Sequence, residues 1–208
     1  VSIVDGKFLV KYSKDVSSRL YVYNLEGKME TEVTLPTMGT AYGFGGKMED
    51  TEVFYTFTSF AYPTTVFRYD IRKNISSLYR KSEIGIDFSK YKTKQIFYSS
   101  KDGTQIPMFI THKKGLIYDG TAPTLLYAYG GFNISINPHF SISRMLLIES
   151  GGIYATANLR GGGEYGESWH EDGMLTNKQN VFDDFIAAAN FLVAENYTSR
   201  EKLAIQGG

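Results

Sequence analysis

The residues best suited to chemistry stand in one short segment, Tyr129-Gly-Gly-Phe132. An apolar run that reads as a buried strand, residues 124–129, leads directly into its glycines. Glycine has no Cβ, so the backbone there can turn sharply and approach a ligand closely. The phenol of Tyr129 could then donate a hydrogen bond, and the ring of Phe132 could line an apolar pocket. An ordinary strand end with turn glycines and core aromatics would have the same pattern.

The sequence around that segment predicts a sheet with crossing helices. Residues 95–100 and 105–112 are expected to form the strands of a hairpin, joined by an Asp-Gly turn. After the strand at 124–129, a short helix is expected at 141–149 and another buried strand at 153–157. The last two strands are apolar throughout, which is typical of a mostly parallel sheet with helices on both faces, and therefore of an α/β fold.

A further strand, loop and helix follow. The strand just described runs into a glycine-dense loop, residues 158–170, which either shapes a binding site or folds over the sheet. Apolar residues at helical spacing then predict a helix over 177–196, and residues 203–205 read as the next buried strand. That strand ends in Gly207-Gly208. Two glycines between a strand and an expected helix are the setting of a nucleophile elbow, in which the nucleophile would be the next residue.

Residues 1–73 have a different pattern, in which short alternating runs are separated by turn residues. The strands expected here are residues 8–12, 19–23, 30–35, 53–58 and 65–69. Phe8 and Tyr23 recur as Phe54 and Tyr69 at one constant interval of about 46 residues, which is near the length of a propeller blade. Such a region holds one or two blades and cannot close into a propeller alone. A plain antiparallel sheet is the alternative.

Composition argues against several classes of function. Lys+Arg and Asp+Glu are both 22, so neither nucleic acid nor an anionic membrane is expected as a partner. Cysteine is absent, which excludes disulfides and thiolate metal sites. The three histidines are far apart in the sequence, so we expect no metal site. The longest nearly apolar run, residues 185–194, is too short to span a bilayer.

The two ends of the chain suggest an internal piece of a longer protein. The first residue is valine, and the segment after it resembles neither a signal peptide nor a transit peptide. The last two residues are glycines directly after an apolar strand, where a finished domain seldom stops. We expect the cytoplasm as the compartment, with the periplasm or secretion as alternatives. We also expect a monomer, formed with the remainder of the same chain.

Several long motifs, in order, resemble those of the prolyl oligopeptidase family. They are Tyr129-Gly-Gly-Phe132-Asn-Ile-Ser-Ile136, Asn158-Leu-Arg-Gly-Gly-Gly-Glu-Tyr-Gly166, Trp169-His170, Asn177-Lys-Gln-Asn180 with Phe182-Asp-Asp-Phe185, and Ile205-Gln-Gly-Gly208. The resemblance is dense over residues 93–208 and looser over 1–92. It implies that residues 1–76 are the C-terminal blades of a β-propeller. Residues 77–208 would then be the N-terminal half of an α/β-hydrolase catalytic domain.

The resemblance also implies a function. The family consists of serine peptidases that cleave short peptides on the carboxyl side of proline, by acyl transfer to a serine that would follow Gly208. Tyr129 matches the family's hydrogen-bond donor to the oxyanion, and Phe132 matches the apolar wall of its proline pocket. A neutral phenol suits the first role, because its effect grows as negative charge develops on the oxygen. The resemblance implies no cofactor.

The remaining ionisable residues are expected to be structural or solvated. The family's catalytic Asp and His lie beyond this chain, and no residue in it matches them. The residues excluded in this way are His112, His139, His170, Asp183 and Asp184. Arg160 is expected to pair with a buried carboxylate or with carbonyls, because its guanidinium presents a rigid fork of donors.

Three alternatives stay open. One is a related oligopeptidase that prefers basic residues, although a phenyl ring at Phe132 in place of an acidic side chain disfavours it. Another is a macrocyclase of the same superfamily, which transfers the acyl group to an amine. The third, from another class, is a propeller-bearing binding protein that has lost its nucleophile. The residue after Gly208 would separate the last from the peptidases, since serine there favours catalysis.

Overall fold

The computed structural model of the chain describes residues 1–207, so Gly208, the second glycine of the expected elbow, lies outside the described residues. Contacts between residues divide the chain into two compact units. Unit 1 contains residues 1–86 with 137–140, and unit 2 contains residues 87–136 with the chain from residue 141 onward. The boundary expected at residue 76 falls inside a strand, β8 (Ile75–Lys81), and the chain passes into unit 2 after Ile86.

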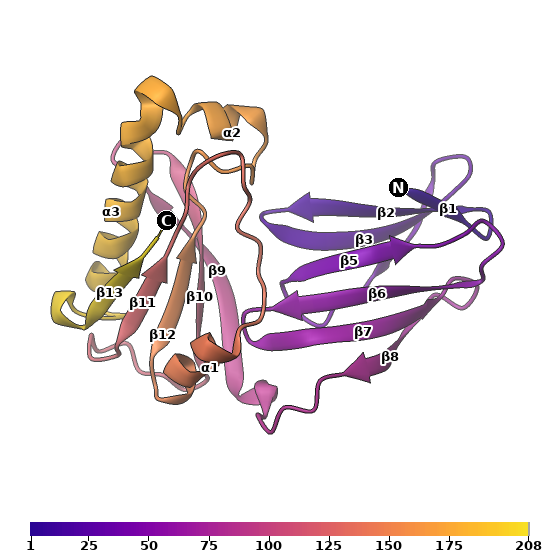
Figure 1. Cartoon of the computed structure of the whole chain (residues 1–208), viewed down its shortest axis with the longest axis horizontal. Coiled ribbons are helices and arrows are strands. Elements are labelled where there is room, and N and C mark those ends of the chain that lie inside the picture. The colour runs from indigo at the N-terminus through magenta and orange to yellow at the C-terminus, as the bar shows by residue number, and fades with distance from the viewer. Residues whose placement is uncertain (208) are drawn as a thin grey trace. The chain divides into compact units, whose positions relative to one another are not determined.

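Unit 1 consists of two antiparallel sheets of four strands each, drawn from indigo to purple in Figure 1. The first contains, in chain order, β1 (Ser2–Val4), β2 (Lys7–Lys14), β3 (Ser17–Asn24) and β4 (Met29–Val33). The second contains β5 (Thr40–Gly45), β6 (Glu52–Ser59), β7 (Tyr62–Asp70) and β8 in the same order. Each sheet is therefore a four-stranded meander, which is the repeating unit of a β-propeller.

The expected sequence repeat is a repeat of structure. Phe8 and Phe54 lie on β2 and β6, the second strand of each sheet, and Tyr23 and Tyr69 lie on β3 and β7, the third. Buried residues of both sheets, such as Leu9 on β2, belong to one hydrophobic cluster. The prediction of one or two blades in this region is confirmed, and the number is two.

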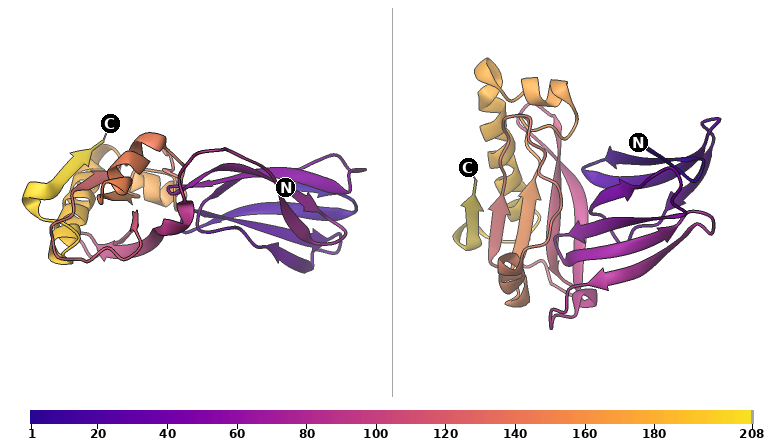
Figure 2. Two further views of the ribbon diagram at one scale, coloured as in Figure 1. Left: turned by 90° about the horizontal axis from the view of Figure 1, so that it is seen from below. Right: turned by 45° about the vertical axis from the view of Figure 1, so that its right-hand side comes forward.

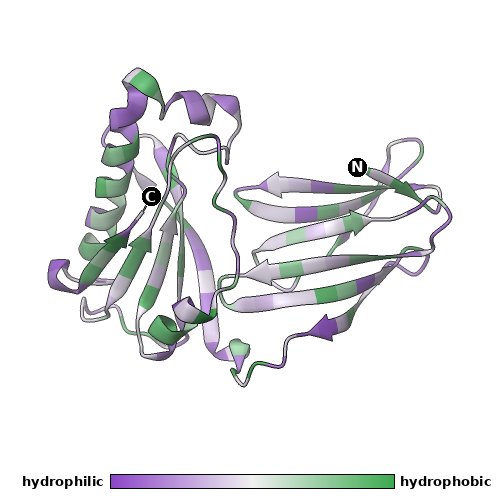
Figure 3. Cartoon of the chain, in the orientation of Figure 1, coloured by the Kyte–Doolittle hydropathy of each residue, from purple (hydrophilic) through white to green (hydrophobic). Residues whose placement is uncertain are grey.

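Three strands of unit 1, namely β1, β5 and β8, were not expected from the sequence. β5 contains Gly43 and Gly45, and its pairing with β6 shifts register between Tyr42 and Gly45, so its alternating pattern is interrupted. β8 is an edge strand with almost every side chain exposed, and it is coloured hydrophilic over much of its length in Figure 3. A strand without a buried face carries no alternating hydrophobic signal.

Unit 2 is built on one five-stranded sheet in the order β13-β11-β12-β10-β9. Its strands are β9 (Tyr91–Ser99), β10 (Gln105–Lys113), β11 (Thr124–Tyr127), β12 (Ile153–Ala157) and β13 (Leu203–Gln206). Its helices are α1 (Ile142–Glu149), α2 (Glu167–Glu171) and α3 (Lys178–Ala194), with 3-10 turns at Phe88–Lys90, Leu175–Asn177 and Arg200–Lys202. β11 pairs in parallel with β12 and β13, and β10 pairs antiparallel with β9 and β12. The expected hairpin and helices are confirmed, as are the buried strands β11 and β12. β13 forms where it was expected, but it is an edge strand and Ile205 is 64% exposed, so the prediction that it is buried is wrong.

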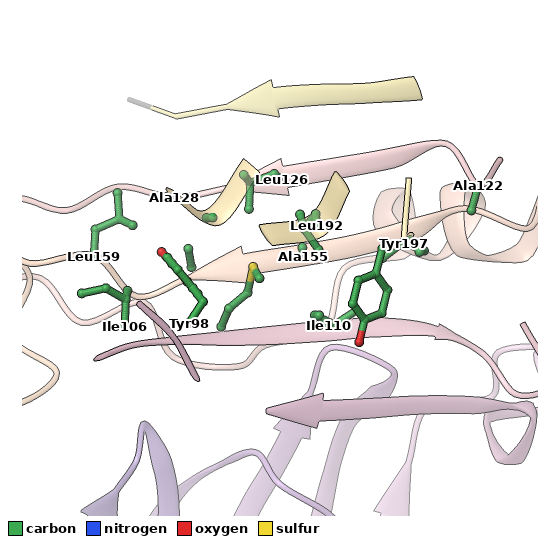
Figure 4. Packing of buried hydrophobic residues seen from close by; sticks show 14 of the residues in the cluster. Tyr98, Ile106, Ile110, Ala122, Leu126, Ala128, Ala155, Leu159, Leu192 and Tyr197 are labelled. Atoms are coloured by element: carbon green, nitrogen blue, oxygen red, sulfur yellow. The ribbon is translucent and has the colours of Figure 1, made fainter. Parts of the chain in front are cut away.

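Side chains alternate between the two faces of this sheet, and each face is covered by a helix. On one face Leu126 and Ala155 belong to the same cluster as Leu192 of α3, as Figure 4 shows. On the other face Tyr154 lies under the guanidinium of Arg144, a residue of α1, at 4.7 Å from the ring centre. α3 runs along the sheet in Figure 1 and in the right-hand view of Figure 2. No helix within residues 1–207 is long and apolar enough to cross a bilayer.

Arg160 ties the glycine-dense loop to α3 and to the β9–β10 turn. Its Nε and Nη2 donate to Asp184 at 3.0 and 2.6 Å, and its Nη1 donates to Asp102 at 2.6 Å. Arg160 and Asp184 are both buried. The guanidinium lowers the pKa of the Asp102 carboxyl to about 2, chiefly by hydrogen bonding. The expectation that Arg160 pairs with a buried carboxylate is confirmed, and Asp184 is its partner.

Asp184→Asn should lower the free energy of unfolding of the full-length protein by about 3 kcal/mol or more, because it leaves the Arg160 charge without its buried partner. Asp183→Asn is the matched control, since the neighbouring carboxylate pairs with the exposed Lys101 ammonium at 3.5 Å and accepts from Gln179 Nε2 at 3.1 Å, without a buried charge as its partner. It should change stability by less than about 1 kcal/mol. Denaturant titration measures both, and equal losses would contradict the assignment.

Candidate active site

The parallel strands of unit 2 end at one edge of the sheet, where Figure 1 shows the arrowheads of β11, β12 and β13 together. At this edge the Ala128 N–H donates to the Gln206 carbonyl at 3.1 Å. A Cβ built on Gly207 would stand 3.0 Å from the Ala128 carbonyl oxygen. The backbone that leads into Tyr129 and the backbone that follows β13 therefore lie side by side, at the sheet edge where sites gather in α/β folds.

Gly130 turns the chain at the end of β11, and only glycine fits there. Its φ is +63°, in the left-handed region. A Cβ would lie 2.6 Å from Val181 Cγ1 and 2.9 Å from Leu159 Cβ. The next residue differs, because a Cβ on Gly131 would meet its nearest atoms at 3.8 Å, which is ordinary contact. The close approach that the sequence predicted at the glycines thus occurs at Gly130, between α3 and the glycine-dense loop.

The next two residues, Phe132 and Asn133, are also left-handed, with φ of +54° and +56°. This conformation is common for asparagine but strained for a bulky side chain, at about 1–2 kcal/mol. Hydrogen bonds hold it in place: Asn133 N–H donates to the Gly161 carbonyl at 3.1 Å, and Ile134 N–H donates to the Gly131 carbonyl at 3.0 Å. Strain that is held in this way is characteristic of functional sites.

His170 strengthens the contact between the turn and the glycine-dense loop. Its Nδ1 lies 2.8 Å from the Gly161 carbonyl oxygen and 3.1 Å from the Asn133 nitrogen. The side-chain Nδ2 of Asn133 also donates to Glu167 Oε2 at 3.2 Å. His170 is therefore structural, as expected, and it acts on the strained turn itself.

Glu164 holds the far end of the turn segment by a second set of hydrogen bonds. Its Oε1 accepts from the Ile136 N–H at 2.9 Å and from Asn158 Nδ2 at 3.1 Å, and the same amide donates to the Ile136 carbonyl at 2.9 Å. Its Oε2 and Asn158 Oδ1 are buried and have no partner among the described residues. Burial raises the pKa of the Glu164 carboxyl. A proton on Oε2 would turn this unpartnered acceptor into a donor.

A cavity of about 550 Å³ opens beside the turn. Phe132, which is 83% exposed, lines this cavity. Met174, Leu175 and Lys178, from the segment that leads into α3, line it as well. Tyr129 does not line this cavity; its side chain is half-buried, and within residues 1–207 its hydroxyl has no hydrogen-bond partner. A larger hollow, about 690 Å³, lies between β9 and α3 and shares no residue with the turn.

Tyr129 and Phe132 thus lie on one turn, as the sequence predicted. Within residues 1–207 the phenol on one side of the glycines has no hydrogen-bond partner, and the phenyl ring on the other side is exposed. The other two histidines do not bond to this turn. His112 is buried and bonds Tyr118 and the Lys113 carbonyl, and His139 bonds the Asn137 carbonyl. Within residues 1–207 no group of three His, Asp or Glu side chains is arranged to hold a metal ion.

The sequence did not single out Glu164 or Lys178 as part of the site. Both stand inside motifs that carried the family resemblance, but nothing in their spacing marks them as neighbours of the turn. Lys178 Nζ donates to the Gly130 carbonyl at 2.9 Å. These contacts join residues far apart in the chain, so only the folded backbone brings them together.

Two family models match the chain. The prolyl oligopeptidase family matches residues 138–208, and the N-terminal β-propeller domain of prolyl oligopeptidase matches residues 1–82. A prolyl endopeptidase of Elizabethkingia miricola is 46% identical over 202 residues, which are 97% of this chain and 29% of that protein. The chain belongs to the prolyl oligopeptidase family. Its two four-stranded sheets are accordingly propeller blades, and unit 2 is part of the hydrolase domain.

Other members of the prolyl oligopeptidase family are also similar. A dual function macrocyclase-peptidase of Galerina marginata is 38% identical over 205 residues, covering 96% of this chain and 28% of that protein. The solved structure of a prolyl endopeptidase aligns with a TM-score of 0.91 at 46% identity, covering all of this chain and 31% of that one. Prolyl oligopeptidase B from Galerina marginata, bound to a 25mer macrocyclization substrate, also gives 0.91, at 37% identity, with 99% and 29% covered. The chain spans less than a third of the length of these relatives.

Gly130→Ala should lower the free energy of unfolding of the full-length protein by about 2 kcal/mol or more. The residue is left-handed, and the new Cβ would collide with Val181 and Leu159. Gly131→Ala, one residue on, has room for its Cβ and should change stability by less than about 0.5 kcal/mol. Thermal and denaturant unfolding compare the two. A Gly130→Ala protein as stable as its Gly131→Ala partner would show that the turn relaxes.

Glu164→Gln should remove a pH-dependent loss of stability. The folded state holds the Glu164 proton above its ordinary pKa of 4.5, so the parent should lose stability as pH rises from that value through the raised pKa. Glutamine keeps the acceptor and adds a neutral donor. The free energy of unfolding of the variant relative to the parent should therefore increase between pH 4.5 and 8. A difference that is constant with pH would show that the carboxyl is ionised in both states.

Proposed function

We propose that the protein is a serine peptidase that cleaves short peptides on the carboxyl side of proline. One observation carries the proposal: the Ala128–Gln206 hydrogen bond sets the start of the Tyr129 turn beside the backbone that leads toward the residue after Gly208. A serine there would stand near a phenol that has no hydrogen-bond partner within residues 1–207. The motifs of the family and the similarity to prolyl endopeptidases support the same reaction.

In the proposed mechanism the serine hydroxyl attacks the carbonyl carbon of the proline residue and gives its proton to a histidine, which an aspartate orients. These three residues lie beyond residue 208. The Tyr129 hydroxyl donates to the oxygen as it becomes an oxyanion. The C–N bond then breaks, the leaving amine takes the proton from the histidine, and water hydrolyses the acyl-enzyme. The chemistry uses only groups of the protein, so no metal or organic cofactor is proposed.

Phe132 is proposed to be a wall of the pocket for the proline ring. Its phenyl ring is 83% exposed on the side of an apolar cavity, which is an unfavourable position unless something apolar covers it. A flat ring packs well against a pyrrolidine ring, and neither carries a charge. The strained backbone of Phe132 gives the ring a defined direction in the absence of substrate, which reduces the entropy lost on binding.

A second outcome of the same chemistry is peptide cyclisation, in which an amine of the acyl group's own peptide replaces water. Similarity to a dual function macrocyclase-peptidase supports this alternative, at 38% identity against 46% for the prolyl endopeptidase. Hydrolysis is therefore the first proposal. Masses of the products from a long proline-containing peptide distinguish the two, because cyclisation gives a product lighter by one water than the hydrolysed peptide.

Tyr129→Phe should lower kcat of the full-length enzyme about 100- to 1000-fold, with little change in KM, because the hydroxyl acts on charge that exists only in the transition state. Tyr127→Phe is the control, since it removes a phenol from the last residue of β11, two residues before Tyr129. It should leave kcat unchanged. Steady-state kinetics on a chromogenic proline peptide measures both, and equal kcat values for Tyr129→Phe and the parent would remove the role.

A further inference from the structure

Lys178 is the first residue of α3, and its side chain folds back onto the turn that separates Tyr129 from Phe132. Its Nζ donates to the Gly130 carbonyl oxygen at 2.9 Å. It also lines the cavity beside Phe132. The residue belongs to the Asn177-Lys-Gln-Asn180 motif, to which the proposed mechanism gives no part.

The place of this lysine is unfavourable for the helix itself. The N-terminus of a helix carries partial positive charge, so a cation in the first turn is destabilising and an anion is preferred. The first turn of α3 has no acidic residue, and no carboxylate of the described residues forms an ion pair with Lys178. Ordering a long side chain also costs rotamer entropy. A residue that breaks local rules in this way points to a functional reason.

The bonded carbonyl belongs to the peptide between Gly130 and Gly131, the most adaptable peptide of the turn. Upstream, Ala128 is held to β13 by its N–H. Downstream, Phe132 has a strained backbone and an exposed ring. A Cβ on Gly131 would stand 3.8 Å from Lys178 Nζ and 3.8 Å from Tyr129 Cε1, so the ammonium and the tyrosine ring flank the same glycine. Rotation of this peptide would move Phe132 relative to Tyr129.

We propose that Lys178 is a positioning residue for specificity. By donating to the Gly130 carbonyl it keeps the ring of Phe132 at the place where the proline ring of the substrate binds. This inference rests on the proposed function. Its consequence is selective. Loss of the lysine should weaken the preference for proline over alanine before the cleaved bond, because only proline depends on the placed phenyl ring.

The test uses the full-length enzyme and two chromogenic peptides that differ only in proline or alanine before the cleaved bond. Lys178→Met removes the charge and the donor at similar length. It should lower kcat/KM for the proline peptide between about 10- and 100-fold and for the alanine peptide by less than about threefold. Lys178→Arg keeps a cationic donor and should restore much of the preference. Lys101→Met removes an exposed lysine that pairs with Asp183, and it should leave the preference intact.

A double-mutant cycle separates positioning from general damage. If Lys178 acts through Phe132, then Lys178→Met should have little further effect on the proline peptide in a Phe132→Ala background. Equal losses on both peptides, or independent effects of the two substitutions, would overturn the inference. Thermal unfolding of each variant identifies any loss caused by misfolding.

Failure of the proposed function would look different. A parent enzyme that does not prefer the proline peptide, or does not cleave it, contradicts the proposed function. A parent that prefers proline while Lys178→Met keeps the same ratio contradicts only the role of the lysine.

Discussion

The steric contact around Gly130 is the constraint on which this site depends. Val181 of α3 and Leu159 of the glycine-dense loop leave no room for a Cβ at this residue, so the end of β11 meets both of them through bare backbone. Closely packed interiors are not continuously deformable, and a turn enclosed in this way has few alternative positions. Tyr129 precedes this residue and Phe132 follows it, so the contact fixes where the turn begins, whereas Gly131 has room and the proposed role of Lys178 concerns the peptide before it.

The glycine-dense loop contains two ionisable side chains, Arg160 and Glu164, whose charges are accommodated in opposite ways. Arg160 cannot lose its charge, so it needs carboxylates from outside the loop, and Asp184 of α3 and Asp102 of the β9–β10 turn accept from its guanidinium. Glu164 forms no ion pair within residues 1–207, and its carboxyl can become neutral by taking up a proton. Arg160 and Asp184 are buried and Glu164 is half-buried, and both arrangements join separate backbone segments. The loop is therefore a scaffold on which the turn is held, and its glycines leave the space that these side chains fill.

Comparison with the relatives shows that the backbone of this segment does not distinguish hydrolysis from cyclisation. A prolyl endopeptidase and prolyl oligopeptidase B bound to a macrocyclization substrate match the chain with the same TM-score of 0.91. The backbone of this segment is thus common to proteins with both kinds of outcome. The choice between water and an amine as acyl acceptor then depends on side chains or on parts of the protein outside residues 1–208. That is consistent with a turn whose proposed tasks, oxyanion stabilisation and proline recognition, precede the choice.

The sequence by itself determined the elements whose residues carry a periodic signal. α3, β11 and β12 were predicted because one face, or both, must leave water, and the blade repeat was visible because equivalent strands carry aromatic residues at equivalent positions. The family also came from sequence, through motifs, and so did the proposed roles of Tyr129 and Phe132. Only the tertiary structure showed that Asp184 is the partner of Arg160, that Glu164 and His170 hold the turn, and that Lys178 reaches Gly130. The physical reason is that periodicity reports burial, which each residue experiences locally, whereas a hydrogen bond between distant residues depends on where two backbones meet in space.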